Sequence, residues 1–182
     1  MTTQDPGGDA FVNAGGDDNQ WGIRVVVGGS TYDWYTPVSN NTKAGVAYAR
    51  SFNNSEDEPV FVFTPALISA QPIADIVSHL VGTSLGLTPD GQTRDYIDES
   101  DKDNPEWVTL TDQFYSGHGT GSTGWGPIMG TPYIRNKPLT QWSQGEYWNP
   151  TNIQDDLALI TEPQGDYDNG IDYRDDDHGN GI

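Results

Sequence analysis

The side chain best suited to chemistry in this 182-residue chain is His79, which lies in the stretch IADIVSHLVGTSLGLTPDG at residues 73–91. Histidine nitrogens bind zinc, and a catalytic zinc ion takes three protein ligands and one water molecule. A carboxylate close to the metal must then accept a proton from that water. The chemistry to look for around His79 is therefore metal-assisted hydrolysis, which requires that the remaining ligands and the carboxylate be present.

The stretch that carries His79 has the spacing of a helix. Its apolar and small residues recur every three or four positions, as they do on the buried side of a helix. These residues are Ile73, Ile76, Val77, Leu80, Val81, Ser84 and Leu85. Pro72 would occupy the first turn, where proline is tolerated, and Gly86 the left-handed position after the last turn. We therefore predict a helix over residues 73–85, followed by a turn at LTPDG.

A glycine-rich loop at residues 115–124 contains His118, and the segment GWGPIMG ends at Gly130. Together with the helix and the Asp-Gly turn, these segments resemble the active-site region of the metzincin zinc peptidases, whose pattern is HExxHxxGxxHD. PIMG resembles their Met-turn. The resemblance is closest to bacterial secreted members with reprolysin-like catalytic domains. It extends over most of the chain through WGIRVVVGG, GVAYARSF, FVFTPAL, QWSQGEY, DDLALIT and YRDDDHGN.

The resemblance implies a vestigial active site from which most of the reacting groups have been lost. When the glycines and the aspartate of the pattern are aligned, His79 matches the first zinc histidine, and Leu80 replaces the general-base glutamate. Thr83 and Pro89 replace the second and third histidines, and Met129 matches the Met-turn methionine. Leucine and proline offer no lone pair, and a neutral threonine hydroxyl is a poor zinc ligand. We therefore expect no bound zinc and no peptidase activity, with His79 hydrogen-bonded to the backbone instead.

The resemblance and the local patterns together predict an α+β fold. Strands are predicted at residues 21–27, 45–52 and 59–64. The first has a nearly continuous apolar run, which suggests burial on both faces. The second is expected at a sheet edge. The twisted, metzincin-like sheet would be mostly parallel, with one antiparallel edge strand, and would pack on the central helix. The C-terminal half is expected to be irregular and rich in Gly and Trp. It would contain the Met-turn and a short last helix capped by Thr151 or Asn152.

The domain is expected to span residues 1–162, with an acidic polar tail at residues 163–182 that serves as a linker or assembly segment. In metzincin domains, a first strand and a long backing helix precede the part that the start of this chain resembles. Such a truncated domain would lack its usual cover along one edge or face of the sheet. An uncovered edge offers unpaired N–H and C=O groups to another chain. Self-association by strand addition or swapping is therefore expected, with head-to-tail contacts leading to filaments.

Charge and composition narrow the range of partners. Lys and Arg number 8 against 27 Asp and Glu, which gives a net charge of −19. Nucleic acids and anionic membranes both bind positive charge, so neither is an expected partner. No apolar run approaches the length needed to span a membrane, so membrane insertion is not expected. The low Lys content and the resemblance together indicate an extracellular protein, either secreted or on the cell surface, that associates with itself or with another protein or peptide.

Two acidic stretches, one within residues 94–113 and one in the tail, have oxygen donors spaced closely enough to suggest calcium, which takes roughly six to eight oxygen ligands. The candidate ligands are Asp98, Glu99, Asp101 and Asp103 in the first stretch, and Asp166, Asp168 and Asp172 in the second. Neither stretch follows the EF-hand register, so an exposed acidic loop is the alternative in each case. Asn40 and Asn53 match the acceptor pattern for N-glycosylation, which is short and common.

Three classes of function remain open. The first is a non-catalytic structural or interaction protein built on a metzincin-like scaffold, and this is the function we expect. The second is a working metallopeptidase in which replacement ligands, such as His118 or an aspartate, join His79. The third is a binding module that keeps the substrate cleft. In that module Trp125, Tyr133 and the edge strand at residues 45–52 would hold an extended peptide without cutting it.

Overall fold

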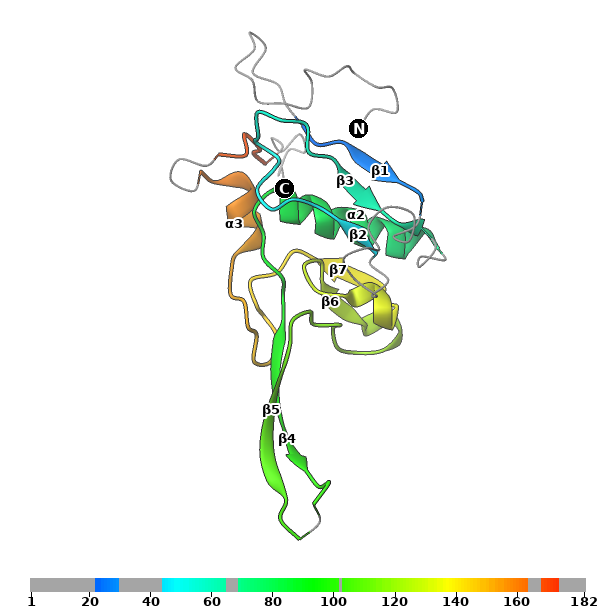
Figure 1. Cartoon of the computed structure of the whole chain (residues 1–182), viewed down its shortest axis with the longest axis vertical. Helices are drawn as coiled ribbons and strands as arrows, with labels where there is room; N and C mark the ends of the chain where they lie inside the picture. The colour runs from blue at the N-terminus through cyan, green and yellow to red at the C-terminus, as the bar shows by residue number, and fades with distance from the viewer. Residues whose placement is uncertain (1–21, 30–43, 65–68, 102, 164–167, 174–182) are drawn as a thin grey trace, which may run out of the picture.

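The computed structural model of the chain describes residues 22–29, 44–64, 69–101, 103–163 and 168–173 (Figure 1). Over these residues the fold is mixed α/β with small sheets and few helices, which agrees with the predicted α+β class. The elements, with η marking a short 3₁₀ helix, are β1 Val25–Val27, β2 Gly45–Val46, β3 Val60–Val62, α2 Ala70–Ser84, β4 Gln92–Asp98, β5 Glu106–Asp112, η4 Gly121–Thr123, β6 Trp125–Pro127, η5 Pro132–Arg135, β7 Leu139–Gln141 and α3 Asp156–Thr161.

The first sheet has three short strands in the order β1–β3–β2. β3 runs parallel to β1 and antiparallel to β2, so the predicted antiparallel edge strand is confirmed, whereas this sheet, with one pairing of each kind, is not mostly parallel. Val60 and Val62 of the central strand are fully buried, as expected for a strand with a neighbour on each side. β2 is much shorter than the predicted strand at residues 45–52, because only two of its residues pair with β3.

The prediction that the strand at residues 21–27 is buried on both faces was wrong. Val26 and Val27 are 39% and 50% exposed. The physical reason is that β1 lies at an edge of this sheet and pairs with a neighbour along one side only, within the described part of the chain. Trp21, the first residue of the predicted strand, lies outside the described residues.

The helix that carries His79 packs against the three-stranded sheet (Figure 1). α2 begins at Ala70 rather than at residue 73 and ends at Ser84, and the predicted left-handed glycine follows it at Gly86, with φ at 102°. Ile76 and Leu80 join the valines of β3 in one buried apolar cluster. Burying an aliphatic side chain of this size stabilises a fold by about 1.5–3 kcal/mol, so this cluster holds helix and sheet together.

The other side of α2 packs against the chain around Met129. A Cβ added at Gly82 would lie 2.7 Å from the Met129 Sδ atom and 3.0 Å from the Trp142 ring, so the helix can approach this closely only because position 82 is glycine. Met129 is fully buried in a second apolar cluster with Leu85, Leu87 and Ile160. Among the described residues, no helix combines the length and apolar character needed to cross a membrane.

β4 and β5 form an antiparallel hairpin that projects from the body of the molecule as a narrow arm (Figure 1). Each strand has seven residues, and the register runs from Gln92 opposite Asp112 to Asp98 opposite Glu106. The interpretation of this region as an acidic loop therefore holds only for the connection, of which residues 99–101 and 103–105 are described. Aromatic and β-branched residues on both strands favour extended backbone, and the carboxylates between them concealed that pattern in the sequence.

The last helix begins later than predicted and has a different cap. α3 begins at Asp156, and Asp155 is its N-cap, because the Asp155 Oδ1 atom accepts a hydrogen bond from the backbone N–H of Ala158 at 3.0 Å. The predicted caps, Thr151 and Asn152, precede the helix by several residues. Short polar side chains cluster here, so the composition indicated a helix start but not which residue makes it.

Replacing Asp155 with Ala should lower the free energy of unfolding by about 1 kcal/mol, because the first turn of α3 would lose its side-chain acceptor. Chemical denaturation of the full chain measures this change. Thr151→Ala serves as the control, since the Thr151 hydroxyl makes no hydrogen bond within the described residues. An equal loss of stability in the two variants would contradict the assignment of Asp155 as the cap.

Candidate functional site

His79 is held by two backbone carbonyl groups near Met129. Its Nδ1 atom lies 2.9 Å from the Ile128 carbonyl oxygen and 3.1 Å from the Gly130 carbonyl oxygen. Both carbonyls are acceptors, so the proton is on Nδ1 and the lone pair of the neutral ring is on Nε2. Burial lowers the pKa of His79, although the two hydrogen bonds oppose this effect. The expected backbone-bonded histidine is therefore confirmed.

The other positions of the vestigial site serve packing and local backbone bonding. Leu80 is buried between α2 and the sheet. The Thr83 hydroxyl donates to the His79 carbonyl oxygen at 3.1 Å, one turn earlier in the helix. Pro89 is partly buried in the loop after α2, and Met129 belongs to the second apolar cluster. The structure thus brings His79 and Met129 together through the backbone, with apolar or hydroxyl side chains at the remaining positions.

His118, the suggested replacement ligand, has partners of its own. Its Nδ1 atom lies 3.1 Å from the Tyr115 hydroxyl, and its ring centroid is 5.3 Å from that of Trp125. Within the part of the chain that the structure describes, no three His, Asp or Glu side chains lie close enough to hold a metal ion. The replacement-ligand hypothesis therefore gains no support from these residues.

The candidate calcium ligands of the first acidic stretch lie at the end of the hairpin. The Asp98 carboxylate accepts a hydrogen bond from the Ser100 N–H, and the Asp101 carboxylate accepts one from the Asp103 N–H. The bond from Ser100 lowers the pKa of Asp98. Glu99 is exposed on the connecting loop. These are local turn contacts, so calcium binding at this end of the hairpin stays a prediction.

The tail positions and the glycosylation motifs are only partly described. Asp168 and Asp172 accept hydrogen bonds from the N–H groups of nearby tail residues, whereas Asp166 and Asn40 lie outside the described residues. The Asn53 side-chain amide donates to the carbonyl oxygen of Asp168. A glycan on Asn53 would have to replace this contact between the body and the tail.

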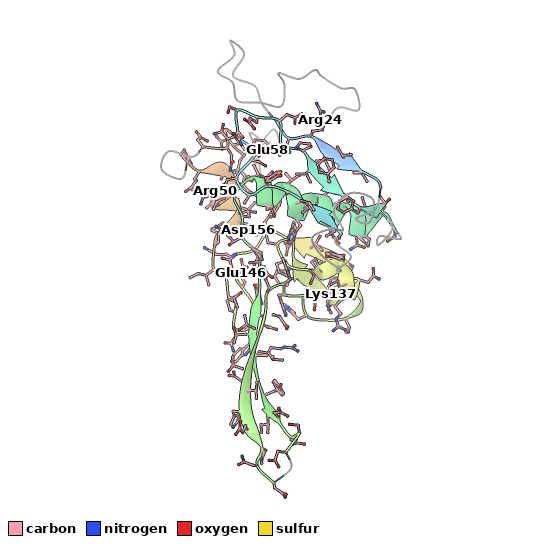
Figure 2. All side chains as sticks on the ribbon, viewed as in Figure 1. Arg24, Arg50, Glu58, Lys137, Glu146 and Asp156 are labelled. Atoms are coloured by element: carbon pink, nitrogen blue, oxygen red, sulfur yellow. The ribbon has the colours of Figure 1, made fainter. Side chains whose placement is uncertain are left out.

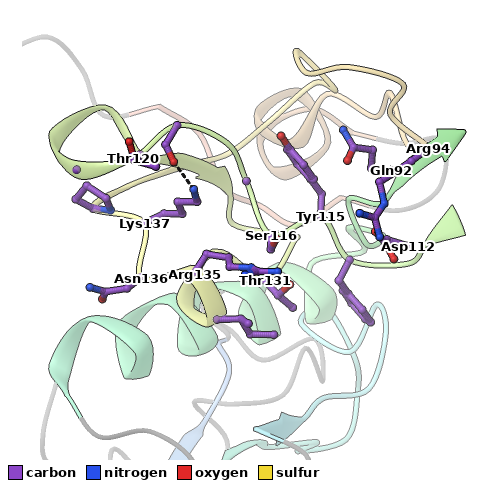
Figure 3. Close-up of a pocket in the computed structure, with 17 residues that line it drawn as sticks. Gln92, Arg94, Asp112, Tyr115, Ser116, Thr120, Thr131, Arg135, Asn136 and Lys137 are labelled. Atoms are coloured by element: carbon purple, nitrogen blue, oxygen red, sulfur yellow. Dashed lines mark hydrogen bonds and ion pairs between the residues drawn. The ribbon is translucent and has the colours of Figure 1, made fainter. Parts of the chain in front are cut away.

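A hollow with a volume of about 730 Å³ lies beside the base of the hairpin (Figure 3). It lies between the base of the hairpin, the glycine-rich loop that contains His118, and the segment that includes η5. The residues around it are Gln92, Arg94, Asp112, Phe114, Tyr115, Ser116, Gly117, Gly119, Thr120, Gly121, Gly124, Thr131, Ile134, Arg135, Asn136, Lys137 and Pro138. We call this hollow the basic pocket, for the charge described next.

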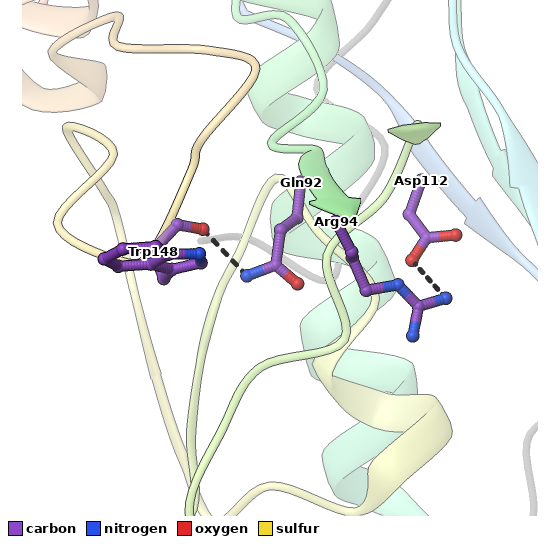
Figure 4. A network of polar contacts seen from close by, with 4 residues as sticks. All are labelled: Gln92, Arg94, Asp112 and Trp148. Carbon is purple, nitrogen blue, oxygen red and sulfur yellow. Dashed lines mark hydrogen bonds and ion pairs between the residues drawn. The ribbon is translucent and has the colours of Figure 1, made fainter. Parts of the chain in front are cut away.

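The basic pocket concentrates positive charge in a strongly acidic chain. It contains Arg94, Arg135 and Lys137, which are three of the 8 basic residues, against a single carboxylate, Asp112. Arg94 pairs with Asp112 at 3.0 Å, and next to them the Gln92 amide donates to the Trp148 carbonyl oxygen at 2.8 Å (Figure 4). The surplus of cations suits an anionic ligand.

Two of these cations are held in different ways. The Lys137 Nζ atom donates to the Gly119 carbonyl oxygen at 2.6 Å, and its side chain is buried. Arg135 lies on η5 and is exposed to solvent. Figure 3 shows Lys137 at one side of the pocket, Arg94 and Asp112 at the other, and Arg135 between them. Sequence reasoning missed this site. The chain has only 8 Lys and Arg residues, so the two that lie close together in TPYIRNKP could have indicated a basic site.

The residues predicted to grip a peptide are not brought together as expected. Trp125 donates from Nε1 to the Gln141 Oε1 atom at 2.7 Å and borders a smaller hollow with His118. Tyr133 packs against the apolar cluster between α2 and the sheet. Trp125 thus borders one hollow and Tyr133 contributes to the core, and a peptide cleft between them stays a prediction.

A pair of buried carboxyl groups, Asp90 and Asp156, was also missed. Asp90 accepts a hydrogen bond from the Asn152 amide at 3.3 Å, and Asp156 accepts one from the Ser143 N–H at 2.9 Å. The second oxygen of each carboxyl group has no partner within the described residues. Burial, helped by the charge of Asp156, raises the pKa of Asp90 to about 7, and burial raises the pKa of Asp156 to about 6.

No protein family, curated protein or solved structure matches the chain. The resemblance to metzincins therefore rests on the residues of the sequence alone.

The raised pKa of Asp90 predicts that the protein loses stability as the pH rises. The folded state keeps a proton that the unfolded state releases at about pH 4, so the free energy of unfolding should fall between about pH 4 and pH 7. Asp90→Asn removes this titration, and at about pH 8 it should raise the free energy of unfolding by roughly 1–3 kcal/mol, since one pKa unit corresponds to about 1.4 kcal/mol. Urea unfolding at several pH values measures both effects.

The matched control for this measurement is Glu99→Gln, which removes one exposed negative charge without touching the buried pair. It should leave the pH dependence unchanged. A wild-type stability that is constant from about pH 5 to pH 8 would contradict the assignment of a raised pKa to Asp90.

Proposed function

We propose that this chain is a non-catalytic extracellular interaction protein that self-associates through the β4–β5 hairpin. The observation that carries the proposal is the outer half of the hairpin, whose side chains project on both faces with no other element beside them among the described residues (Figures 1 and 2). A two-stranded hairpin alone is at most marginally stable in water, and it needs a further strand or a packed surface for stability. A partner that covers the arm would supply that surface.

The exposed apolar side chains of the hairpin support this proposal. Trp107 is 75% exposed and lies opposite Ile97, which is 45% exposed. On the other face, Tyr96 is 42% exposed and lies opposite Val108, and Leu110 is 43% exposed. Large apolar side chains that gather on an exposed surface are typical of protein interaction sites, and tryptophan is prominent among residues that dominate binding energy.

The absence of catalysis is part of the same proposal. Zinc peptidase chemistry needs three ligands and a carboxylate, and in the alignment of this chain His79 alone matches that set. Leu80, at the glutamate position, contributes to the core beneath the sheet. A carboxylate introduced there would be buried without a partner, at a cost of several kcal/mol.

A second candidate function is a peptide-binding module, and the basic pocket is the observation that favours it. Its volume of about 730 Å³ is within the usual range for a binding site. The ligand would enter beside Arg135 rather than between Trp125 and Tyr133. In both candidates the protein binds another polypeptide without cutting it.

Light scattering coupled to size-exclusion chromatography tests self-association. The wild-type chain should show a mass that increases with concentration, and Trp107→Ser should weaken association at least tenfold, or about 1.4 kcal/mol. Trp148→Ser is the matched control, because Trp148 is 78% exposed but lies outside the hairpin strands. A wild-type monomer at every concentration would overturn the proposal, and equal effects of the two variants would show that the hairpin is not responsible.

Elemental analysis tests the vestigial zinc site. The wild-type chain should carry no stoichiometric zinc, whereas Thr83→His with Pro89→His should bind one zinc ion per chain, because these changes restore the two histidines missing beside His79. Leu80→Glu adds the base, and this triple variant should be less stable because residue 80 is buried. Thr83→Ala with Pro89→Ala is the control. Stoichiometric zinc in the wild-type protein would contradict the proposed loss of the site.

A further inference from the structure

The hairpin end and the basic pocket carry opposite charge. The hairpin end comprises the connection at residues 99–101 and 103–105 and the strand residues next to it. Its carboxylates are Asp98, Glu99, Asp101, Asp103 and Glu106, and the sequence has one cation between them, Lys102, which lies outside the described residues. The basic pocket has a surplus of cations, of which Arg135 is exposed. Complementary charge of this kind selects partners and orients their approach.

The two surfaces also carry apolar groups that could pack together. On the hairpin, Trp107 and Ile97 lie opposite each other one pair before the end of the strands, between the carboxylates. In the basic pocket, Ile134 is 64% exposed and Phe114 is 37% exposed. An aromatic anchor in a pocket, surrounded by charged pairs at the rim, is a common arrangement for a protein interface.

The hairpin end cannot reach the basic pocket of its own chain. Gln92, Arg94 and Asp112, at the base of the hairpin, belong to the lining of the pocket. The strands then carry their other end away from the body (Figure 1), over about 20 Å, because seven residues make six steps of about 3.4 Å each. The distance between base and tip is fixed by the paired register of the hairpin. A contact between the two surfaces must therefore join two copies.

We propose that the hairpin end of one copy docks in the basic pocket of a second copy. The hairpin carboxylates would pair with Arg135 and compete with Asp112 for Arg94, while Trp107 packs against Ile134 and Phe114. This inference rests on the proposed self-association and identifies the contact that produces it. Because the two surfaces differ, the contact is head-to-tail. An open assembly then has a free hairpin end on one terminal copy and a free basic pocket on the other, so it can add further copies or close into a ring.

Charge exchange between two variants tests this contact. Arg135→Glu reverses the charge at one exposed cation of the pocket, and Glu99→Lys with Asp101→Lys reverses the charge at two carboxylates of the hairpin end. Each variant alone should associate at least tenfold more weakly than the wild type. An equimolar mixture should recover association, because the carboxylate introduced at position 135 can pair with the lysines introduced at positions 99 and 101, and the unaltered pocket of one variant can still bind the unaltered hairpin end of the other. Sedimentation velocity with EDTA present, which removes calcium bridging between carboxylates, measures all of these samples.

Arg24→Glu is the control for net charge. Arg24 lies in the region of β1, away from Lys137 and the pocket (Figure 2), and its pair with Asp57 is partly exposed. This variant should associate like the wild type, and circular dichroism should show that every variant is folded. A wild-type monomer would overturn both this inference and the proposed function. Association that Arg135→Glu leaves unchanged, or a mixture that does not recover, would overturn this contact alone and leave self-association in place.

Discussion

The close packing on both sides of α2 is the constraint on which the rest of the structure depends. Leu80 and Ile76 bind the helix to the sheet, and the bare backbone at Gly82 lets the Met129 segment approach from the other side. The His79 ring holds this segment in place through its contacts with the Ile128 and Gly130 carbonyl oxygens. The segments on either side of Met129 border the basic pocket, so the position of the pocket depends on this contact.

Local patterns in the sequence were sufficient for the central part of the fold. The apolar spacing around His79 predicted α2 and the glycine after it, and the run at Val60 predicted the middle strand. The surroundings of His79 were also predicted, because a lone histidine on a buried helix must satisfy its ring with backbone groups. The exposure of β1 at a sheet edge was not predicted, since an apolar run does not reveal whether a strand lies at the centre or the edge of a sheet.

The features most relevant to function depend on contacts between distant parts of the chain. The hairpin strands contain carboxylates among their aromatic and β-branched residues. The high local charge therefore suggested an exposed loop rather than two strands. The basic pocket assembles residues from near position 94, from near 117 and from near 135, which no local pattern connects. Asp90 and Asp156 likewise meet only through folding, and their raised pKa values arise from burial that the sequence does not display.

The attachment of the hairpin has a consequence for how such a protein diversifies. Its base is tied to the body by backbone and side-chain bonds from Gln92 and Thr93 to the segment around Trp148 and Asn149, whereas its outer half contacts nothing else in the described chain. Substitutions there leave both apolar clusters intact. The binding specificity of the arm can therefore change through substitutions, or through grafting of another hairpin, while the fold of the two apolar clusters stays the same.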